Sequence, residues 1–310
     1  MPYELDNRLV IGVSSGAVFD HGAGAAVFAE KGEDEYRRYQ EARMDEPLPK
    51  GVAFSFIKRL LSLNDLSPGP DDPLVEIVLL SKNDPGAGLR VMNSLAHYGL
   101  DVSRAIFMQG KSPYEYIPAL NISLFLSANK NDIEGAIKKG FPAGKIVDSA
   151  AVDDPGDNSL RLAFDFDGVL ADDESEAVMH RTNDVSQFHD FEVANVTRPH
   201  NPGPLKEFLV RVSKIMAIEE AHKRLVPGYT NRLTVSIVTA RSAPAHERAL
   251  NTLKSWGVRA NNAFFLGGVD KGKVLSVLRP HIFFDDQSRH LKSSSAVAPS
   301  VHIPFGIRNI

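Results

Sequence analysis

Two aspartates, Asp165 and Asp167, stand where an apolar segment gives way to a glycine, Gly168. Side chains two residues apart on a strand point to the same side, so both carboxylates would face one ligand. Two neighbouring carboxylates repel each other unless a cation lies between them or one takes up a proton. A hard divalent cation such as Mg²⁺ would satisfy both and would also bind a phosphate. The pair therefore indicates metal-dependent phosphate chemistry.

Three later segments carry polar groups at the end of a predicted strand or the start of a predicted helix. Thr239 ends an apolar run, Lys271 opens a helix, and Asp285 and Asp286 end another short apolar run. A lysine at a helix start can neutralise a phosphate, because the helix N-terminus itself favours anions. Taken singly, each could be an ordinary strand-end, turn or surface residue, and Lys273 is an alternative to Lys271.

Together these segments resemble the four motifs of the haloacid-dehalogenase-like (HAD) superfamily, in the order in which that superfamily carries them. The resemblance implies that Asp165 is the nucleophile that accepts the phosphoryl group and that Asp167 is the general acid and base. It also implies that Thr239, the backbone at Ala240, and Lys271 hold the phosphate. The implied ligands of Mg²⁺ are Asp165, Asp167 and one of Asp285 and Asp286, the other of which would orient neighbouring groups.

Longer stretches of the chain look like the cytosolic type I 5′-nucleotidases. That family removes phosphate from nucleoside 5′-monophosphates with Mg²⁺, so a nucleoside 5′-monophosphate is the implied substrate. Asp270 departs from the family pattern, in which proline is expected, and leaves the choice between Lys271 and Lys273 open. Two alternatives remain, a HAD phosphatase for sugar phosphates or other small phosphomonoesters and a nucleotide-sensing regulatory protein. The resembling stretches are residues 9–20, 88–110, 167–176, 237–243, 265–272, 279–287 and 302–307.

The elements that would position these residues are short apolar strands that alternate with helical stretches. This pattern is typical of a parallel sheet with crossover helices, and strands that are apolar nearly throughout are covered on both faces. A helix is predicted at Lys271–Leu278. We expect a HAD-like three-layer α/β sandwich with a mainly parallel sheet. The predicted strands are Leu9–Val13, Leu74–Leu80, Leu162–Phe166, Leu233–Thr239, Ala263–Leu266 and Ile282–Phe284.

The two halves of the sequence resemble each other. Residues 75–128 align with residues 233–286 without a gap at an offset of 158, and ten of the 54 pairs are identical. Either the similarity is chance, or the halves are copies of one α/β unit and the first copy has lost the catalytic residues. We therefore predict an N-terminal half, residues 1–155, without catalytic carboxylates, and a catalytic half, residues 156–310. The turn-rich segment Asp153–Asn158 would separate them.

Between the first and second motifs lie residues 172–232, too many for a simple crossover. The resemblance implies an α-rich cap that closes over the site. Glu174 would contact the substrate, and Phe188 and Phe191 would either stack on a base or form the core of the cap. The run Leu205–Ile218 is predicted to be an amphipathic helix of this cap.

Composition excludes several classes of function. A formal net charge of −4 gives no global basic field to recruit a nucleic acid polymer or an anionic membrane. The absence of cysteine excludes disulfides and thiolate sites. The N-terminal segment lacks the basic start and long apolar stretch of a signal peptide, so a cytoplasmic protein is expected. An adenine nucleotide effector acting on the N-terminal half and a homo-oligomeric state are further hypotheses.

Overall fold

A computed structural model describes residues 4–309, so residues 1–3 of the expected first unit and Ile310 lie outside the description. The chain divides into two compact units, Met1–Phe141 and Pro142–Ile310. The division falls before the turn-rich segment that we expected to mark it. The reason is strand β5 (Ala143–Val147), which pairs antiparallel with strand β10 (Ser300–His302) of the second unit.

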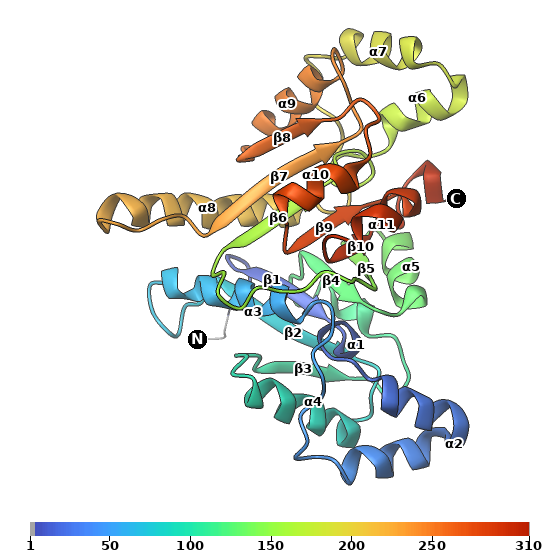
Figure 1. Ribbon diagram of the computed structural model, residues 1–310, viewed down its shortest axis with the longest axis vertical. Coiled ribbons are helices and arrows are strands. Elements are labelled where there is room, and N and C mark those ends of the chain that lie inside the picture. Colours follow the sequence, from blue (N-terminus) through green and yellow to red (C-terminus); the bar gives the residue numbers. More distant parts are fainter. Residues whose placement is uncertain (1–3, 310) are drawn as a thin grey trace. The chain divides into compact units, whose positions relative to one another are not determined.

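The first unit is a parallel sheet with the strand order β3-β2-β1-β4 (Figure 1). Its strands are apolar where buried, and β1 and β2 are buried along their whole length. Helix α2 is interrupted at Gly32, whose φ of +81° is not helical. The strands are β1 (Leu9–Val13), β2 (Val75–Ser81), β3 (Arg104–Phe107) and β4 (Leu124–Ser127). The helices are α1 (Ser15–Val18), α2 (Gly22–Glu41), α3 (Phe54–Ser62), η1 (Leu63–Leu66), α4 (Pro85–His97), η2 (Pro113–Tyr116) and α5 (Lys130–Lys138).

The second unit has the strand order β5-β10-β9-β6-β7-β8, and all its neighbouring strands are parallel except β5 and β10. The remaining strands are β6 (Leu160–Phe164), β7 (Leu233–Thr239), β8 (Asn262–Phe265) and β9 (Ile282–Asp285). The helices are α6 (Glu174–Thr182), α7 (Val185–Ala194), α8 (Lys206–Leu225), α9 (His246–Ser255), α10 (Lys271–Leu278), α11 (Ser288–Ser294) and η3 (Ile307–Asn309). The expected α/β fold with a mainly parallel sheet is confirmed.

The two units repeat one topology. The order β3-β2-β1-β4 in the first unit corresponds to β8-β7-β6-β9 in the second. Strands β2, β3 and β4 begin and end 158 residues before β7, β8 and β9, which is the offset found in the sequence. Chance similarity would not place three strands at one constant offset. The structure therefore favours two copies of one α/β unit.

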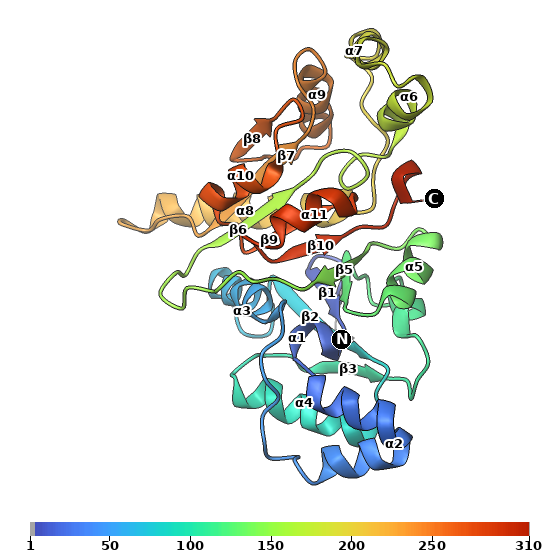
Figure 2. The ribbon, with the colours of Figure 1, turned by 45° about the vertical axis from the view of Figure 1, so that its right-hand side comes forward.

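Helix α8 covers the sheet of the second unit and is not a cap helix, so that prediction was wrong. The ring of Phe208 on α8 lies 5.9 Å from the rings of both Phe164 on β6 and Phe284 on β9, and all three are fully buried. Burying each such side chain contributes about 1.5–3 kcal/mol, which fixes α8 against the strands. The helices inserted after β6 are therefore α6 and α7, which lie side by side (Figure 2).

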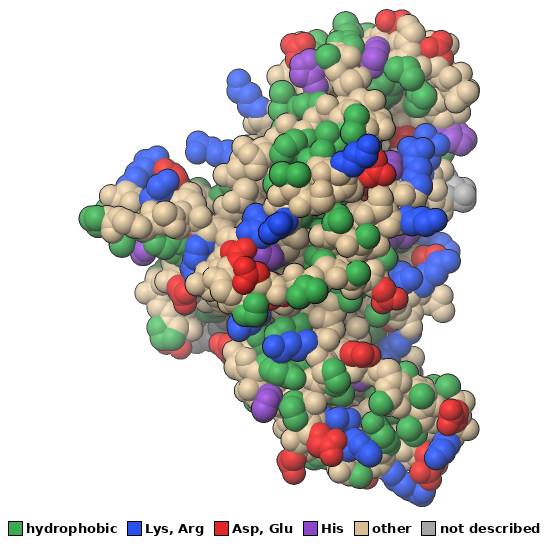
Figure 3. Space-filling model, viewed as in Figure 1, with side chains coloured by type: hydrophobic (Ala, Val, Ile, Leu, Met, Phe, Trp, Pro, Cys, Tyr) green, Lys and Arg blue, Asp and Glu red, His purple; other side chains and the backbone are tan. Residues whose placement is uncertain are grey.

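Charged side chains of both signs are interspersed on the face shown in Figure 3, in keeping with the small net charge of −4. Within residues 4–309, no helix is both long enough and apolar enough to cross a membrane.

Candidate active site

A cavity of about 450 Å³ opens at the carboxyl ends of β6 and β7, the edge at which parallel α/β sheets bind ligands. The loops after the two strands form its floor, and α6 and α7 supply further walls. Strand β6 ends at Phe164, two residues earlier than expected, so Asp165 directly follows the strand and Asp167 lies in the loop. Of the residues predicted from the sequence, those that line the cavity are Asp165, Asp167, Thr239, Ala240 and Phe188.

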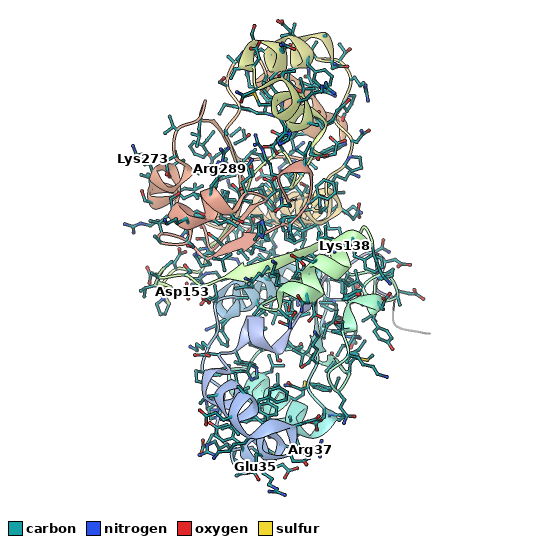
Figure 4. All side chains as sticks on the ribbon, turned by 90° about the vertical axis from the view of Figure 1, so that its right-hand side faces the viewer. Glu35, Arg37, Lys138, Asp153, Lys273 and Arg289 are labelled. Atoms are coloured by element: carbon teal, nitrogen blue, oxygen red, sulfur yellow. The ribbon has the colours of Figure 1, made fainter. Side chains whose placement is uncertain are left out.

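Lys271 joins two of the predicted carboxylates. Its Nζ lies 2.6 Å from Oδ2 of Asp165 and 2.7 Å from Oδ2 of Asp285, and all three residues are buried. Lys271 is the first residue of α10, and the side chain of Asp270 caps this helix by accepting a hydrogen bond from the backbone N–H of Gly272. Asp270, the departure from the family pattern, is thus an ordinary N-cap. Lys273 is exposed on the surface of α10 (Figure 4), so of the two lysines it is Lys271 that contacts the predicted carboxylates.

Asp286 is the one predicted carboxylate without a partner among the described residues. Both of its side-chain oxygens are buried and accept no hydrogen bond. The loop after β6 passes close to it, because a Cβ added to Gly168 would lie 2.7 Å from Cγ of Asp286. Gly168 has a φ of +70°, so both the space and the backbone conformation require glycine there. A buried carboxylate with no partner is costly and calls for a cation or a proton.

The pKa values of the buried aspartates also distinguish the unpartnered Asp286 from its neighbours. Burial raises the pKa of Asp286 to about 10, and the nearby charges of Asp165 and Asp285 add to the shift. Burial also raises the pKa of Asp165, to about 7, although Lys271 acts in the opposite direction. Burial would raise the pKa of Asp285, but the charges and hydrogen bonds of Lys271 and His290 together hold it below its usual value. Asp285 is therefore a satisfied anion, and Asp286 is not.

Asp167 is held by an arginine that the sequence did not single out. The guanidinium of Arg241 contacts both carboxylate oxygens of Asp167, Nε at 2.7 Å and Nη2 at 2.6 Å. Arg241 follows β7 two residues after Thr239, and its own backbone N–H donates to the Thr239 hydroxyl at 3.3 Å. This bidentate pairing fixes the direction of the Asp167 carboxylate.

A buried network continues from Arg241 into the inserted helices. Its centre is Glu192 on α7, whose carboxylate accepts hydrogen bonds from the guanidinium groups of Arg241 and Arg248 and from the Ser175 hydroxyl. His200 lies 3.4 Å from the same carboxylate. Burial alone would raise the pKa of Glu192, but the contacts with His200, Arg241 and Ser175 lower it to about 2. Glu192 therefore links α7 to the loop that holds Asp167.

The three predicted substrate contacts have different outcomes. Phe188 lines the cavity, and the guanidinium of Arg241 lies 5.5 Å from the centre of its ring. Phe191 does not line it, and its ring instead lies 5.4 Å from the guanidinium of Arg248. Glu174 also points away, since it pairs with Arg248 at 3.0 Å and with Arg198 at 3.3 Å.

Glu176 takes the position that we expected for Glu174. It lines the cavity, and its Oε1 accepts hydrogen bonds from Gln287 and Arg308, each at 2.8 Å. Two residues along a helix are rotated by about 200°, so only one of the two glutamates can face the cavity. Composition and spacing gave no signal for which of them it is.

A second set of atoms has the geometry of a metal site. Three possible ligand atoms lie within 4.8 Å of one another, one each from Asp165, Asp285 and His290. The ammonium of Lys271 already bridges Asp165 and Asp285, so a divalent cation there would face a positive charge. Among the predicted carboxylates of the described chain, the Asp286 oxygens have no such cationic partner.

Comparison with known proteins agrees with this geometry. The model of the family described as 5′-nucleotidase matches residues 1–310. Cytosolic 5′-nucleotidase 1B of Homo sapiens is 34% identical to the chain over 302 residues, which are 94% of this chain and 48% of that protein. The chain thus spans about half the length of this curated relative. No solved structure shows a significant match to the chain.

Proposed function

The chain belongs to the 5′-nucleotidase family, and from that premise we propose that it hydrolyses nucleoside 5′-monophosphates to nucleosides and phosphate. The observation that carries the proposal is the arrangement at the end of β6. Asp165 lines the cavity and forms a buried ion pair with Lys271. Asp167, two residues later in the chain, forms an ion pair with Arg241. This arrangement offers a nucleophile, a phosphate-neutralising cation and a separately held acid–base group.

The residues also fit a divalent cation. The four aspartates of the site carry four negative charges when ionised, against two positive charges on Lys271 and Arg241. Two negative charges remain, and the unpartnered oxygens of Asp286 show where a counter-charge is lacking. We propose that Asp165, Asp167 and Asp286 hold Mg²⁺ and that Asp285 orients Lys271. Bound there, the ion would neutralise the charge of the phosphate and permit the approach of the Asp165 carboxylate.

The reaction then has two steps. An Asp165 oxygen attacks phosphorus, the bond from phosphorus to the ester oxygen breaks, and Asp167 gives a proton to the departing hydroxyl of the nucleoside. Water next attacks phosphorus and loses a proton to Asp167, and the bond from phosphorus to the Asp165 oxygen breaks. Phosphate leaves, Asp165 is again a carboxylate, and Asp167 is again a carboxylic acid. Arg241 fixes the direction of Asp167 throughout, and Thr239 and the backbone at Ala240 lie where they can hold phosphate oxygens. Phe188 would contact the nucleoside.

The test is phosphate release from the four common nucleoside 5′-monophosphates, the matching 3′-monophosphates and a sugar phosphate, with Mg²⁺ and with excess chelator. We expect release that is sensitive to chelator and confined to 5′-monophosphates. The Asp165→Asn variant should lose turnover and keep its circular dichroism spectrum. Release from all phosphomonoesters would instead favour a general phosphatase, and activity above a few per cent in Asp165→Asn would refute the nucleophile.

A cytosolic location is part of the proposal, and it rests on the similarity to the human cytosolic 5′-nucleotidase 1B. An adenine nucleotide effector and a homo-oligomeric state stay predictions, which binding and sedimentation measurements on the full chain can decide.

A further inference from the structure

The first unit contains a cavity at the place that corresponds to the candidate active site. It measures about 460 Å³ and lies at the carboxyl ends of β1, β2 and β3. At the offset of 158 residues, Lys82–Asn83 corresponds to Ala240–Arg241 and Gln109–Gly110 corresponds to Gly267–Gly268. All eight residues line their respective cavities. The repeated topology has thus preserved a binding cavity as well as the strands.

The catalytic groups have no counterparts there. The strand registers place Ser14 and Gly16 after β1 where Asp165 and Asp167 follow β6, and at the offset of 158 residues Lys271 corresponds to Pro113. Asp285, which ends β9, and Asp286 after it correspond to Ser127 and Ala128. No carboxylate pair remains at those positions to hold a metal or to attack phosphorus. The first cavity is therefore suited to binding without turnover.

The charges at this cavity are already paired. Lys82, the one cation among its described lining residues, lies 2.7 Å from Asp132. Glu33 lies 3.3 Å from Arg37, and Asp84 caps helix α4 while lying 3.8 Å from the same arginine. Together these side chains carry three negative and two positive charges, so a phosphate would gain no net attraction at this cavity. An uncharged ligand is not affected by this balance.

Two polar atoms at the cavity are buried and have no partner. Nδ2 of Asn83 is a donor, since Oδ1 of the same amide accepts a long hydrogen bond from the Tyr36 hydroxyl at 3.5 Å. Nε2 of His21 is an acceptor, because burial lowers the pKa of the ring and its other nitrogen bonds the backbone of Ser15. Both residues line the cavity, so a turn of either side chain would present this donor or acceptor to the polar edge of a planar heterocycle.

An aromatic wall completes the site. In a straight helix Phe28 and Tyr36, eight residues apart, would be about 12 Å apart along the axis. The interruption of α2 at Gly32 brings their rings to 5.8 Å in a perpendicular contact, and both line the cavity. Phe28 keeps 53% of its surface exposed, so a large apolar face is available to a ligand. An exposed aromatic side chain beside unsatisfied polar atoms is typical of a small-molecule site.

We propose that the cavity of the first unit is a metal-independent binding site for an uncharged planar heterocycle, with nucleosides as the ligand class. Donor, acceptor and aromatic wall define the heterocycle, and the paired charges disfavour a phosphate group. The choice of nucleosides within that class rests on the proposed function, of which nucleosides are a product.

The test measures binding of adenosine, guanosine, cytidine and uridine to the full chain by calorimetry in excess chelator. Ala25 lines the cavity from α2, and Ala25→Phe should fill it and weaken binding at least tenfold, as should Asn83→Ala. The matched control is Ala29→Phe, an exposed residue of the same helix outside the cavity lining, and it should bind like the wild type. Thermal unfolding confirms that each variant is folded.

The proposal is overturned if none of the four nucleosides binds, or if Ala25→Phe and Asn83→Ala both bind like the wild type. It is also overturned if the 5′-monophosphate binds this cavity ten times more tightly than its nucleoside in chelator, because that result contradicts the charge argument. Binding lost only in Phe188→Ala would place the ligand in the second unit and would overturn it as well. Phosphate release by Ala25→Phe is measured in parallel, so failure of the proposed phosphatase activity is seen separately.

Discussion

Replacing Glu192 by glutamine tests whether the buried network holds the inserted helices to the second unit. The substitution keeps the shape of the side chain but removes the charge that faces Arg241 and Arg248. Removing one partner of a buried ion pair costs about 3–5 kcal/mol. Arg241 would still pair with Asp167, and Arg248 would still pair with Glu174, so we expect a loss at the low end of this range. The variant should be about 3 kcal/mol less stable at pH 7.

The pKa of Glu192 gives a second route to the magnitude. A shift from the ordinary value of 4.5 to about 2 corresponds to about 3.5 kcal/mol at ~1.4 kcal/mol per pKa unit, close to the first figure. Because the folded pKa is lowered, this stability is fully present above pH 4.5 and is lost as the pH falls toward 2. The difference between wild type and Glu192→Gln should therefore be about 0.8 kcal/mol smaller at pH 4 than at pH 7.

The chain has a single tryptophan, Trp256, directly after α9 in the second unit. Urea unfolding followed by its fluorescence therefore reports on that unit. The matched control is Glu207→Gln, which removes an exposed pair with Arg211 and should change stability by less than ~0.5 kcal/mol. A Glu192→Gln variant within 0.5 kcal/mol of wild type at pH 7, or a difference that stays constant down to pH 4, would refute the reasoning.

Three further substitutions test the site itself. Lys271→Ala leaves two buried carboxylates without their cation and should lower kcat by about 100-fold or more, whereas Lys273→Ala should stay within about twofold in the same phosphate-release assay. Phe188→Ala should raise the KM for nucleoside 5′-monophosphates about fivefold, for ~1 kcal/mol of lost stacking, and Phe191→Ala should lower the melting temperature with KM unchanged. Gly168→Ala places a methyl group against Asp286 in a left-handed backbone conformation, so we expect weaker Mg²⁺ activation in a metal titration, and unchanged activation would contradict the close approach.

The sequence was sufficient where local pattern decides the structure. The bounds predicted for β7 and α10 agree with the structure because an apolar run and a polar start define each element. The carboxylates and Lys271 came together because the carboxyl ends of parallel strands share one edge of the sheet. Their order along the chain was enough to predict that.

Packing decided what the sequence could not show. The apolar spacing of α8 is the same whether a helix covers a sheet or belongs to a cap, and only the contact of Phe208 with Phe164 and Phe284 distinguishes the two. The partnership of Glu192 with Arg241 joins residues 49 positions apart through three-dimensional packing. The arginine directly after the Thr239–Ala240 pair was the only local signal of that network, and nothing in the sequence pointed to its partner.

The lone carboxylate of Asp286 gives the proposed ion a second effect. A ligand that binds the folded form and not the unfolded form stabilises the fold in proportion to the logarithm of its concentration. With Mg²⁺ bound as proposed, the second unit would be held together partly by a solute. The first unit has serine, glycine and alanine where the three proposed ligands stand, so its stability would not respond to the ion. Scarcity of the ion would then shorten the lifetime of the catalytic half as well as slow its chemistry.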